Sequence, residues 1–160
     1  MSHRNKNYRA QPTGKYAPMP LSVMDTPAWR ALSSAAQALY PWLVMEFKGK
    51  QFNNNRQIRL SVRQAALKMG KSKDTAARAF RDLQAKGFLR VVRGASLGVS
   101  GMGKTTEYEI TTITTPSNPL RASDDFKNWS KGNDFDVFEH PHKNPRGKNK
   151  PCHKYRAATY

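Results

Sequence analysis

The stretch SVRQAALKMGKSKDTAARAFRDLQAKG, residues 61–87, contains two amphipathic segments with almost nothing between them. Apolar residues recur at three- and four-residue spacing on each side of Gly70, as expected for helices that each bury one face. Each segment opens with a serine, Ser61 or Ser72, that can cap a helix, and Gly70 and Gly87 can adopt the left-handed conformation that ends one. The stretch therefore predicts two helices joined by a tight turn, with alanine-rich faces that allow close approach.

Further helices are predicted before this stretch. Thr26 followed by Pro27 is typical of a helix start. SAAQALYPWLVMEFK predicts a longer helix capped by Ser34, whose spacing to Gln37 fits a capping box, as does the spacing of Ser61 to Gln64. Pro41 lies inside the longer helix and is expected to bend it or shift its start.

Three short segments, IRL, FLRVV and TTEYEITTI, have the composition or alternation of β-strands. In the last of them, Tyr108 and Ile110 are expected to face the interior, while Glu107, Glu109 and Thr111 are expected to face outward.

The sequence GVSGMGKT, residues 98–105, fits the G-x-x-x-x-G-K-[ST] pattern of a phosphate-binding loop. A true loop of this kind opens a helix, whereas the residues after Lys104 alternate like a strand. We therefore interpret the segment as the tip of a hairpin, with Arg93 and Lys104 supplying positive charge. We expect no enzyme, and a nucleotide hydrolase is the remote alternative.

The chain has 28 Lys and Arg against 11 Asp and Glu, a formal net charge of +17. Such an excess indicates a polyanionic partner, above all nucleic acid. Three parts are predicted: a flexible basic arm (1–20), a compact domain (21–115) and an extended polar and basic tail (116–160). We expect the tail to dock locally through Phe126 and Trp129.

The order helix, short strand, helix, tight turn, helix and hairpin resembles a winged helix-turn-helix domain. RLSVRQAALKMGKSKDTAARAFRDLQAKGFLRVV and the hairpin through Ile110 carry this resemblance over residues 57–112. It implies an α+β fold with a three-helix core and a small antiparallel β-hairpin wing, here flanked by extended basic arms. Similar modules occur in bacterial transcription regulators and in plasmid and phage replication proteins, so the resemblance implies sequence-specific binding of double-stranded DNA.

In that family the helix after the turn enters the major groove and the wing touches the DNA backbone. At about 100° per residue, helix 72–86 directs one flank away from its apolar stripe. The base-contact candidates on or beside that flank are Asp74, Ala77, Arg78 and Arg81. Asp74 could accept from cytosine or orient Arg78. The phosphate-contact candidates are Arg59, Arg63, Lys71, Ser72, Lys73, Arg93 and Lys104. An ordinary solvated helix face is the alternative for these charges.

The same residues allow a partner other than DNA and an assembly of two copies. The alternative to DNA binding is binding to RNA or a ribosome-associated role. The family also allows a homodimer, although the sequence has no heptad repeat that would form a coiled-coil dimer interface. The sequence has a single cysteine, its first residues do not resemble a signal peptide, and no apolar run approaches the ~20 residues of a membrane span. These features favour a location in the cytoplasm, near the nucleoid. No cofactor is expected.

Two polar clusters in the tail are expected to carry no chemistry of their own. The spacing of His140, His142, Cys152 and His153 does not match a usual zinc pattern, so no metal is expected. The acidic residues of the tail are Asp124, Asp125, Asp134, Asp136 and Glu139. They have no pocket predicted around them, and the alternative role is to fold back on the domain's own basic face when DNA is absent.

Overall fold

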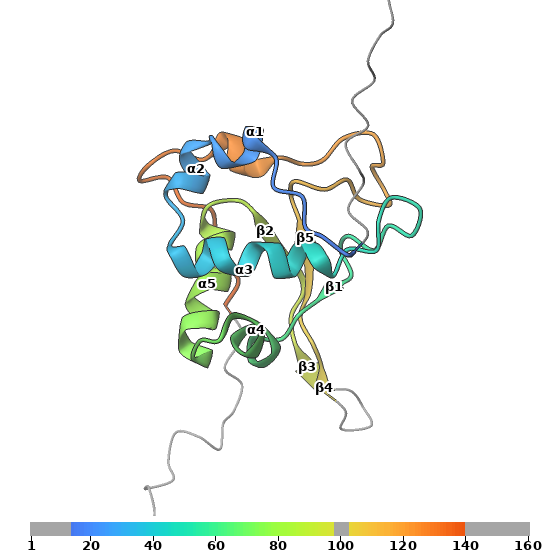
Figure 1. The fold of residues 1–160 in the computed structure, drawn as a ribbon, viewed down its shortest axis with the longest axis vertical. Helices are drawn as coiled ribbons and strands as arrows, with labels where there is room; N and C mark the ends of the chain where they lie inside the picture. Colours follow the sequence, from blue (N-terminus) through green and yellow to red (C-terminus); the bar gives the residue numbers. More distant parts are fainter. Residues whose placement is uncertain (1–13, 98–102, 140–160) are drawn as a thin grey trace, which may run out of the picture.

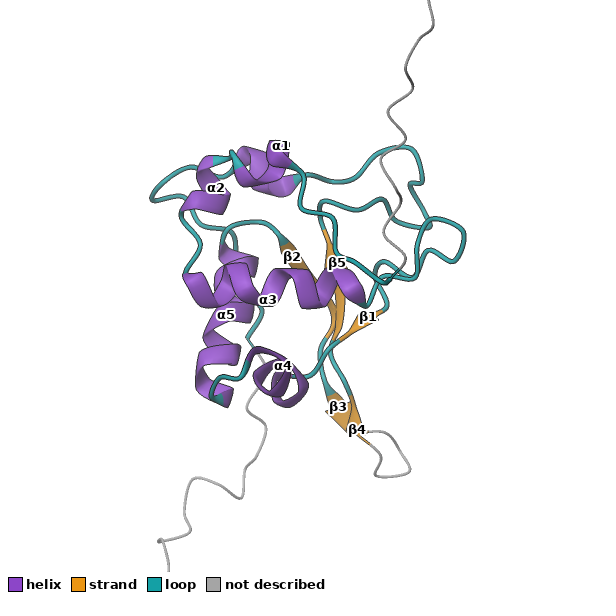
Figure 2. Cartoon of the chain, in the orientation of Figure 1, coloured by secondary structure: helices purple, strands orange, loops and turns teal. Residues whose placement is uncertain are grey.

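Three main helices and a small antiparallel sheet form the body of this α+β protein (Figures 1 and 2). The computed structural model describes residues 14–97 and 103–139. The main helices are α3 (Ser34–Met45), α4 (Val62–Met69) and α5 (Lys73–Ala85). The shorter helical segments are α1 (Leu21–Met24), α2 (Pro27–Arg30) and the 3-10 turn η1 (Asp125–Asn128).

Local capping residues fix the boundaries of α4 and α5. The Ser61 hydroxyl accepts from the Gln64 backbone N–H while the Gln64 side chain accepts from the Ser61 N–H, so the predicted capping box is confirmed. Gly70 ends α4 with φ 62°, and the Ser72 hydroxyl accepts from the Thr75 N–H at the start of α5. The tight turn between the two helices is therefore specified by the residues at its own ends.

The start of α3 differs from the prediction by one residue. Ser33, not Ser34, is the N-cap. The Ser33 N–H donates to the Asp82 carboxylate of α5 at 2.7 Å, and the Gln37 side chain donates to a carbonyl of α2 at 3.0 Å instead of closing a capping box. Tertiary contacts thus set this end of the helix, and α3 continues through Pro41 to Met45.

The sheet has the order β1 (Ile58–Arg59), β5 (Glu107–Ile110), β2 (Leu89–Arg93), with both pairs antiparallel. Because β5 is the central strand, all four of its residues are buried. Glu107, Glu109 and Thr111 were expected to face outward into solvent, and this expectation is wrong because all three residues are buried. The Thr111 hydroxyl donates to the Gly87 carbonyl, and the two glutamates pair with arginines of the neighbouring strands and with Arg56, which precedes β1.

A second, two-stranded ribbon continues from β2 and β5. In it β3 (Ser96–Leu97) pairs with β4 (Gly103–Lys104), and it projects at the end of the molecule where α4 and the start of α5 lie (Figure 1). The glycine-rich motif thus joins two strands, as predicted, and Thr105 lies in the link between β4 and β5. Residues 98–102, at the tip, lie outside the described residues.

Aromatic rings join the helices to the sheet and to the segment after it. The ring of Phe88 meets Trp29 and Tyr40 edge-on and stacks on Phe126 with ring centroids 4.8 Å apart. Phe126 and Trp129 are both buried, so the predicted docking through these two residues is confirmed.

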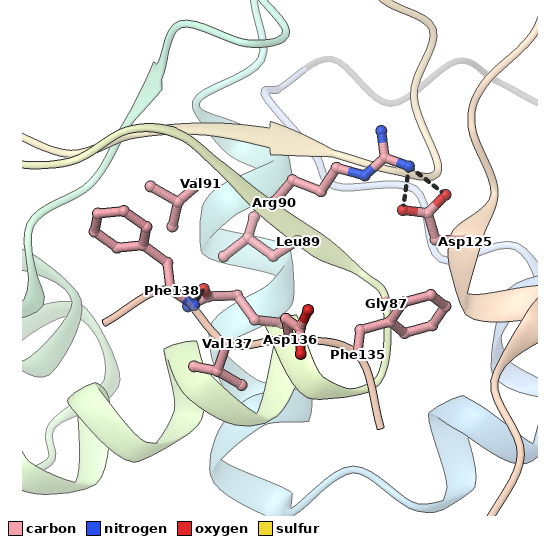
Figure 3. A pocket seen from close by; sticks show the side chains of 10 residues that line it. Gly87, Leu89, Arg90, Val91, Asp125, Phe135, Asp136, Val137 and Phe138 are labelled. Atoms are coloured by element: carbon pink, nitrogen blue, oxygen red, sulfur yellow. Dashed lines mark hydrogen bonds and ion pairs between the residues drawn. The ribbon is translucent and has the colours of Figure 1, made fainter. Parts of the chain in front are cut away.

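Residues 134–139, which we call the C-terminal strap, lie along the end of α5. The Phe135 N–H donates to the Ala85 carbonyl at 2.9 Å, and the Phe138 N–H donates to the Gln84 side chain at 3.0 Å. Gly87 has φ 77°, and a β-carbon there would come within 2.7 Å of the Phe135 ring. A groove of about 420 Å³ separates the strap from β2 (Figure 3).

Candidate nucleic-acid interface

Helix α5 turns an apolar face inward and a charged face outward. Ala76, Ala79, Phe80 and Leu83 are buried, and the Phe80 ring stacks on Tyr108 of β5. Arg78 and Arg81 are exposed, as the helical projection predicts. Among the described residues neither arginine forms an ion pair, so the suggested role of Asp74 in orienting Arg78 is not seen.

The four base-contact candidates, Asp74, Ala77, Arg78 and Arg81, line one groove of about 610 Å³. The sheet contributes Val91 and Tyr108 to this groove, and the strap contributes Phe138 and Glu139. Glu139 is one of the tail acids for which folding back on the basic face was the alternative role, and it lies in this groove with Arg78 and Arg81. The fold thus brings two arginines and two carboxylates, those of Asp74 and Glu139, to one concave surface beside the outer flank of α5.

The turn between α4 and α5 gathers a second set of charges. Arg63, Lys71, Ser72 and Lys73 are all exposed, and within residues 14–97 and 103–139 none of the three cations has an ion-pair partner. Since the Ser72 hydroxyl already accepts from Thr75, it serves as the helix cap. The groups left for a phosphate are the lysines, Arg63 and the remaining free N–H groups at the start of α5.

Three further phosphate-contact candidates, Arg59, Arg93 and Lys104, surround Glu107 at the base of the ribbon. Arg59 Nε donates to the Glu107 carboxylate at 3.0 Å, and a guanidinium nitrogen of Arg93 lies 3.8 Å from it. The hydrogen bond from Arg59, with the charges of Arg93 and Lys104, holds the pKa of Glu107 below its usual range. Three cations around one carboxylate still leave an excess of positive charge in this groove of about 270 Å³.

Arg56 and Arg90 were missed as site residues by the sequence reasoning. Both lie beside the Glu109 carboxylate, at 3.4 and 3.6 Å. The available signal was the pair of glutamates spaced by two in a strand, which need cationic neighbours if that strand is central. Lys68, by contrast, pairs with Glu46 and lies over the Trp42 ring on the side of α3, away from the other cations.

Two of the tail acids do fold back on basic residues of the body. Asp125 pairs with Arg90 at 2.6 Å and Asp134 with Lys86 at 2.7 Å. The hydrogen bonds from Lys86 and from the Trp129 indole lower the pKa of Asp134. Asp124 instead pairs with Lys127 of its own segment.

The described part of the chain has no group of three or more His, Cys, Asp or Glu side chains placed to hold a metal ion. His140, His142, Cys152 and His153 lie outside the described residues, as does the first part of the basic arm. No helix within the described ranges is long and apolar enough to cross a bilayer.

No family model, curated protein or solved structure matches the chain.

Proposed function

We propose that the chain is a winged helix-turn-helix protein that binds double-stranded DNA in a sequence-specific manner. The order α3, β1, α4, α5, β2, β5 supports this assignment, with α5 as the recognition helix and the β3–β4 ribbon as the wing. The observation that carries the proposal is the pair Arg78 and Arg81, exposed on α5 and lining one groove with Asp74 and Ala77.

The proposed mechanism begins with α5 in the major groove of DNA. This groove is about 12 Å wide and admits one helix. Arg78 and Arg81 lie three residues apart, so both guanidiniums project from the same side. Each can donate two hydrogen bonds to the O6 and N7 atoms of a guanine, and Asp74 can accept from a cytosine amino group.

Phosphate contacts then fix the orientation of the helix. Lys71 and Lys73 flank the start of α5, where free N–H groups and the helix dipole favour an anion. Arg93 and Lys104 belong to the proposed wing and carry charge along the adjacent backbone. These contacts supply affinity without sequence information.

The biological role proposed is that of a transcription regulator or a replication-associated factor of a bacterium, plasmid or phage. The net charge of +17 supports a nucleic-acid partner in either role. RNA is the alternative partner, and the cytoplasm is the proposed location.

The test starts with selection of bound fragments from a random duplex library by the full chain. Affinity for the selected duplex is then measured by fluorescence anisotropy for Arg78→Gln and Arg81→Gln. We expect each to weaken binding by about 1–3 kcal/mol, the loss for one bidentate base contact.

Arg30→Gln is the matched control, because Arg30 is an exposed arginine of α2 that pairs only with Asp25 among the described residues. The duplex RNA of the same sequence is the competitor, since its deep, narrow major groove does not admit side chains. Equal losses for Arg78→Gln and Arg30→Gln, or preference for the RNA, would refute the proposal.

A further inference from the structure

The outer face of the sheet carries a paired arrangement of charges. Glu107 and Glu109 lie two residues apart on β5, so both point to the face opposite Tyr108, which packs on α5. Each glutamate lies between two arginines, one from either side of β5: Arg59 and Arg93 flank Glu107, and Arg56 and Arg90 flank Glu109.

Two backbone irregularities produce this arrangement. Arg90 and Arg93 are three residues apart and would face opposite sides in a regular strand. A register shift between Val91 and Arg93 places Arg90 across from Glu109 and Arg93 across from Glu107. On the other side, Arg56 has φ 80°, a conformation that residues other than glycine rarely adopt. Strained positions of this kind cluster at functional sites.

The carboxylates do not neutralise this surface. The four arginine side chains are 49–64% exposed, whereas the Glu107 and Glu109 side chains are only 8–9% exposed. The solvent-facing groups are therefore guanidiniums, and the buried carboxylates beneath them hold them in position. Each guanidinium has five N–H donors, more than its glutamate contact uses. Arg90 also reaches Asp125 (Figure 3).

The row of charges continues at both ends of β5. Lys104 lines the groove at the ribbon end, and Arg121 lines a groove of about 270 Å³ at the other end. Six cations thus face three carboxylates along one stripe, which consists of Arg56, Arg59, Arg90, Arg93, Lys104, Arg121, Glu107, Glu109 and Asp125. The groove at Arg121 also contains Ser117, Asn118 and Ser123, whose side chains offer neutral donors for phosphate oxygens.

We propose that the part of this stripe away from the ribbon, around Arg56, Arg90 and Arg121, binds the phosphate backbone of a second nucleic-acid segment, on the face of the sheet opposite α5, while Arg93 and Lys104 at the ribbon end contact the first segment. Guanidinium groups in a row match a chain of phosphates, because each can donate two parallel hydrogen bonds to one phosphate. The inference rests on the proposed function in one respect, that nucleic acid is the polyanion. A protein with two such surfaces bridges two segments.

A bridging assay tests this inference. The full chain is mixed with a donor-labelled duplex, selected as above, and an acceptor-labelled second segment, either single-stranded or duplex, and energy transfer is followed. We expect energy transfer with the natural protein. For the double variant Arg56→Gln with Arg121→Gln, we expect half-maximal transfer to need about tenfold more protein, because two charge-assisted contacts are lost. The two acceptors show which form of nucleic acid the stripe takes.

The matched control is Arg30→Gln with Lys131→Gln, which removes the same charge at exposed positions outside the stripe. Since Arg56 helps to hold a buried glutamate, Arg121→Glu is the second variant; among the described residues Arg121 has no ion-pair partner. Equal bridging by the stripe variants and the control overturns the inference. Unchanged duplex affinity in Arg78→Gln and Arg81→Gln, with bridging still dependent on Arg121, overturns only the role of α5.

Discussion

At the scale of single residues, Asn55 is the polar side chain on which the central strand depends. It is 1% exposed. Its amide nitrogen donates to the carbonyls of Ile110 and Ile113 at 2.9 and 2.8 Å, and its oxygen accepts from the Ile110 N–H at 2.8 Å. One side chain therefore satisfies both backbone groups of Ile110, the last residue of β5, on the side where the short strand β1 does not extend far enough to pair with it.

We predict that Asn55→Ala lowers the free energy of unfolding by about 2–4 kcal/mol, because at least two buried backbone groups lose their partner. Urea denaturation followed by circular dichroism measures the change. Asn128→Ala is the control, because Asn128 is exposed on η1. A loss for Asn55→Ala no larger than that of the control would show that water replaces the lost amide.

The sequence predicts residues of regular helices well, but not buried polar residues. The exposure of Arg78 and the capping by Ser61 and Ser72 follow from local spacing. Asn55 lies in QFNNNRQ, where three asparagines look alike and only the tertiary fold selects one for burial. The burial of Glu107 was likewise missed because alternation gives the face of a strand and not what covers that face.

At the scale of elements, α5 shares its charged groove with the C-terminal strap. Glu139 lines the same groove as Arg78 and Arg81, and Asp136 lines the neighbouring groove between the strap and β2. If DNA phosphates approach these arginines, the two carboxylates repel them. The strap therefore competes with the proposed ligand of α5.

We predict that Asp136→Asn with Glu139→Gln tightens binding of the selected duplex by about three- to tenfold, or roughly 1 kcal/mol. Anisotropy titration at constant salt measures this. Asp25→Asn with Glu46→Gln makes the same change in net charge elsewhere on the protein. If both double variants bind alike, the effect is one of total charge, and weaker binding would mean that the strap contributes contacts to DNA.

The three main helices and the three strands of the sheet could be predicted because their signals are local, whereas β3, β4 and the particular contacts that hold the strap could not. Serine caps and left-handed glycines mark α4 and α5 within a few residues. The strap is held by hydrogen bonds between Phe138 and Gln84 and between Phe135 and Ala85, pairs about fifty residues apart. No periodic pattern in the strap encodes such contacts.

At the scale of the whole molecule, positive charge is spread over several surfaces. The turn between α4 and α5, the base of the ribbon and the outer sheet face each present cations. Binding to a polyanion at these surfaces would release many counterions from the nucleic acid. The affinity should then depend strongly on salt.

We predict that raising the salt concentration from about 50 to about 200 mM weakens duplex binding on the order of 10³-fold or more, if six or more phosphates are contacted. Lys104→Ala should weaken binding to all sequences alike and reduce the slope by about one counterion. Anisotropy titrations over this range, with Lys131→Ala as control, give the slopes. An affinity indifferent to salt would contradict an electrostatic mode of binding.

The stacking of Phe126 on Phe88 has a consequence for how the protein is made. A nascent chain that has emerged only as far as Thr115 lacks the rings of Phe126 and Trp129, both of which are buried in the finished core. During synthesis the core around Phe88 is therefore incomplete, with the Phe88 ring partly uncovered, until this late segment leaves the ribosome. Shortened versions of the protein would meet the same difficulty, and would expose an aromatic surface prone to aggregation.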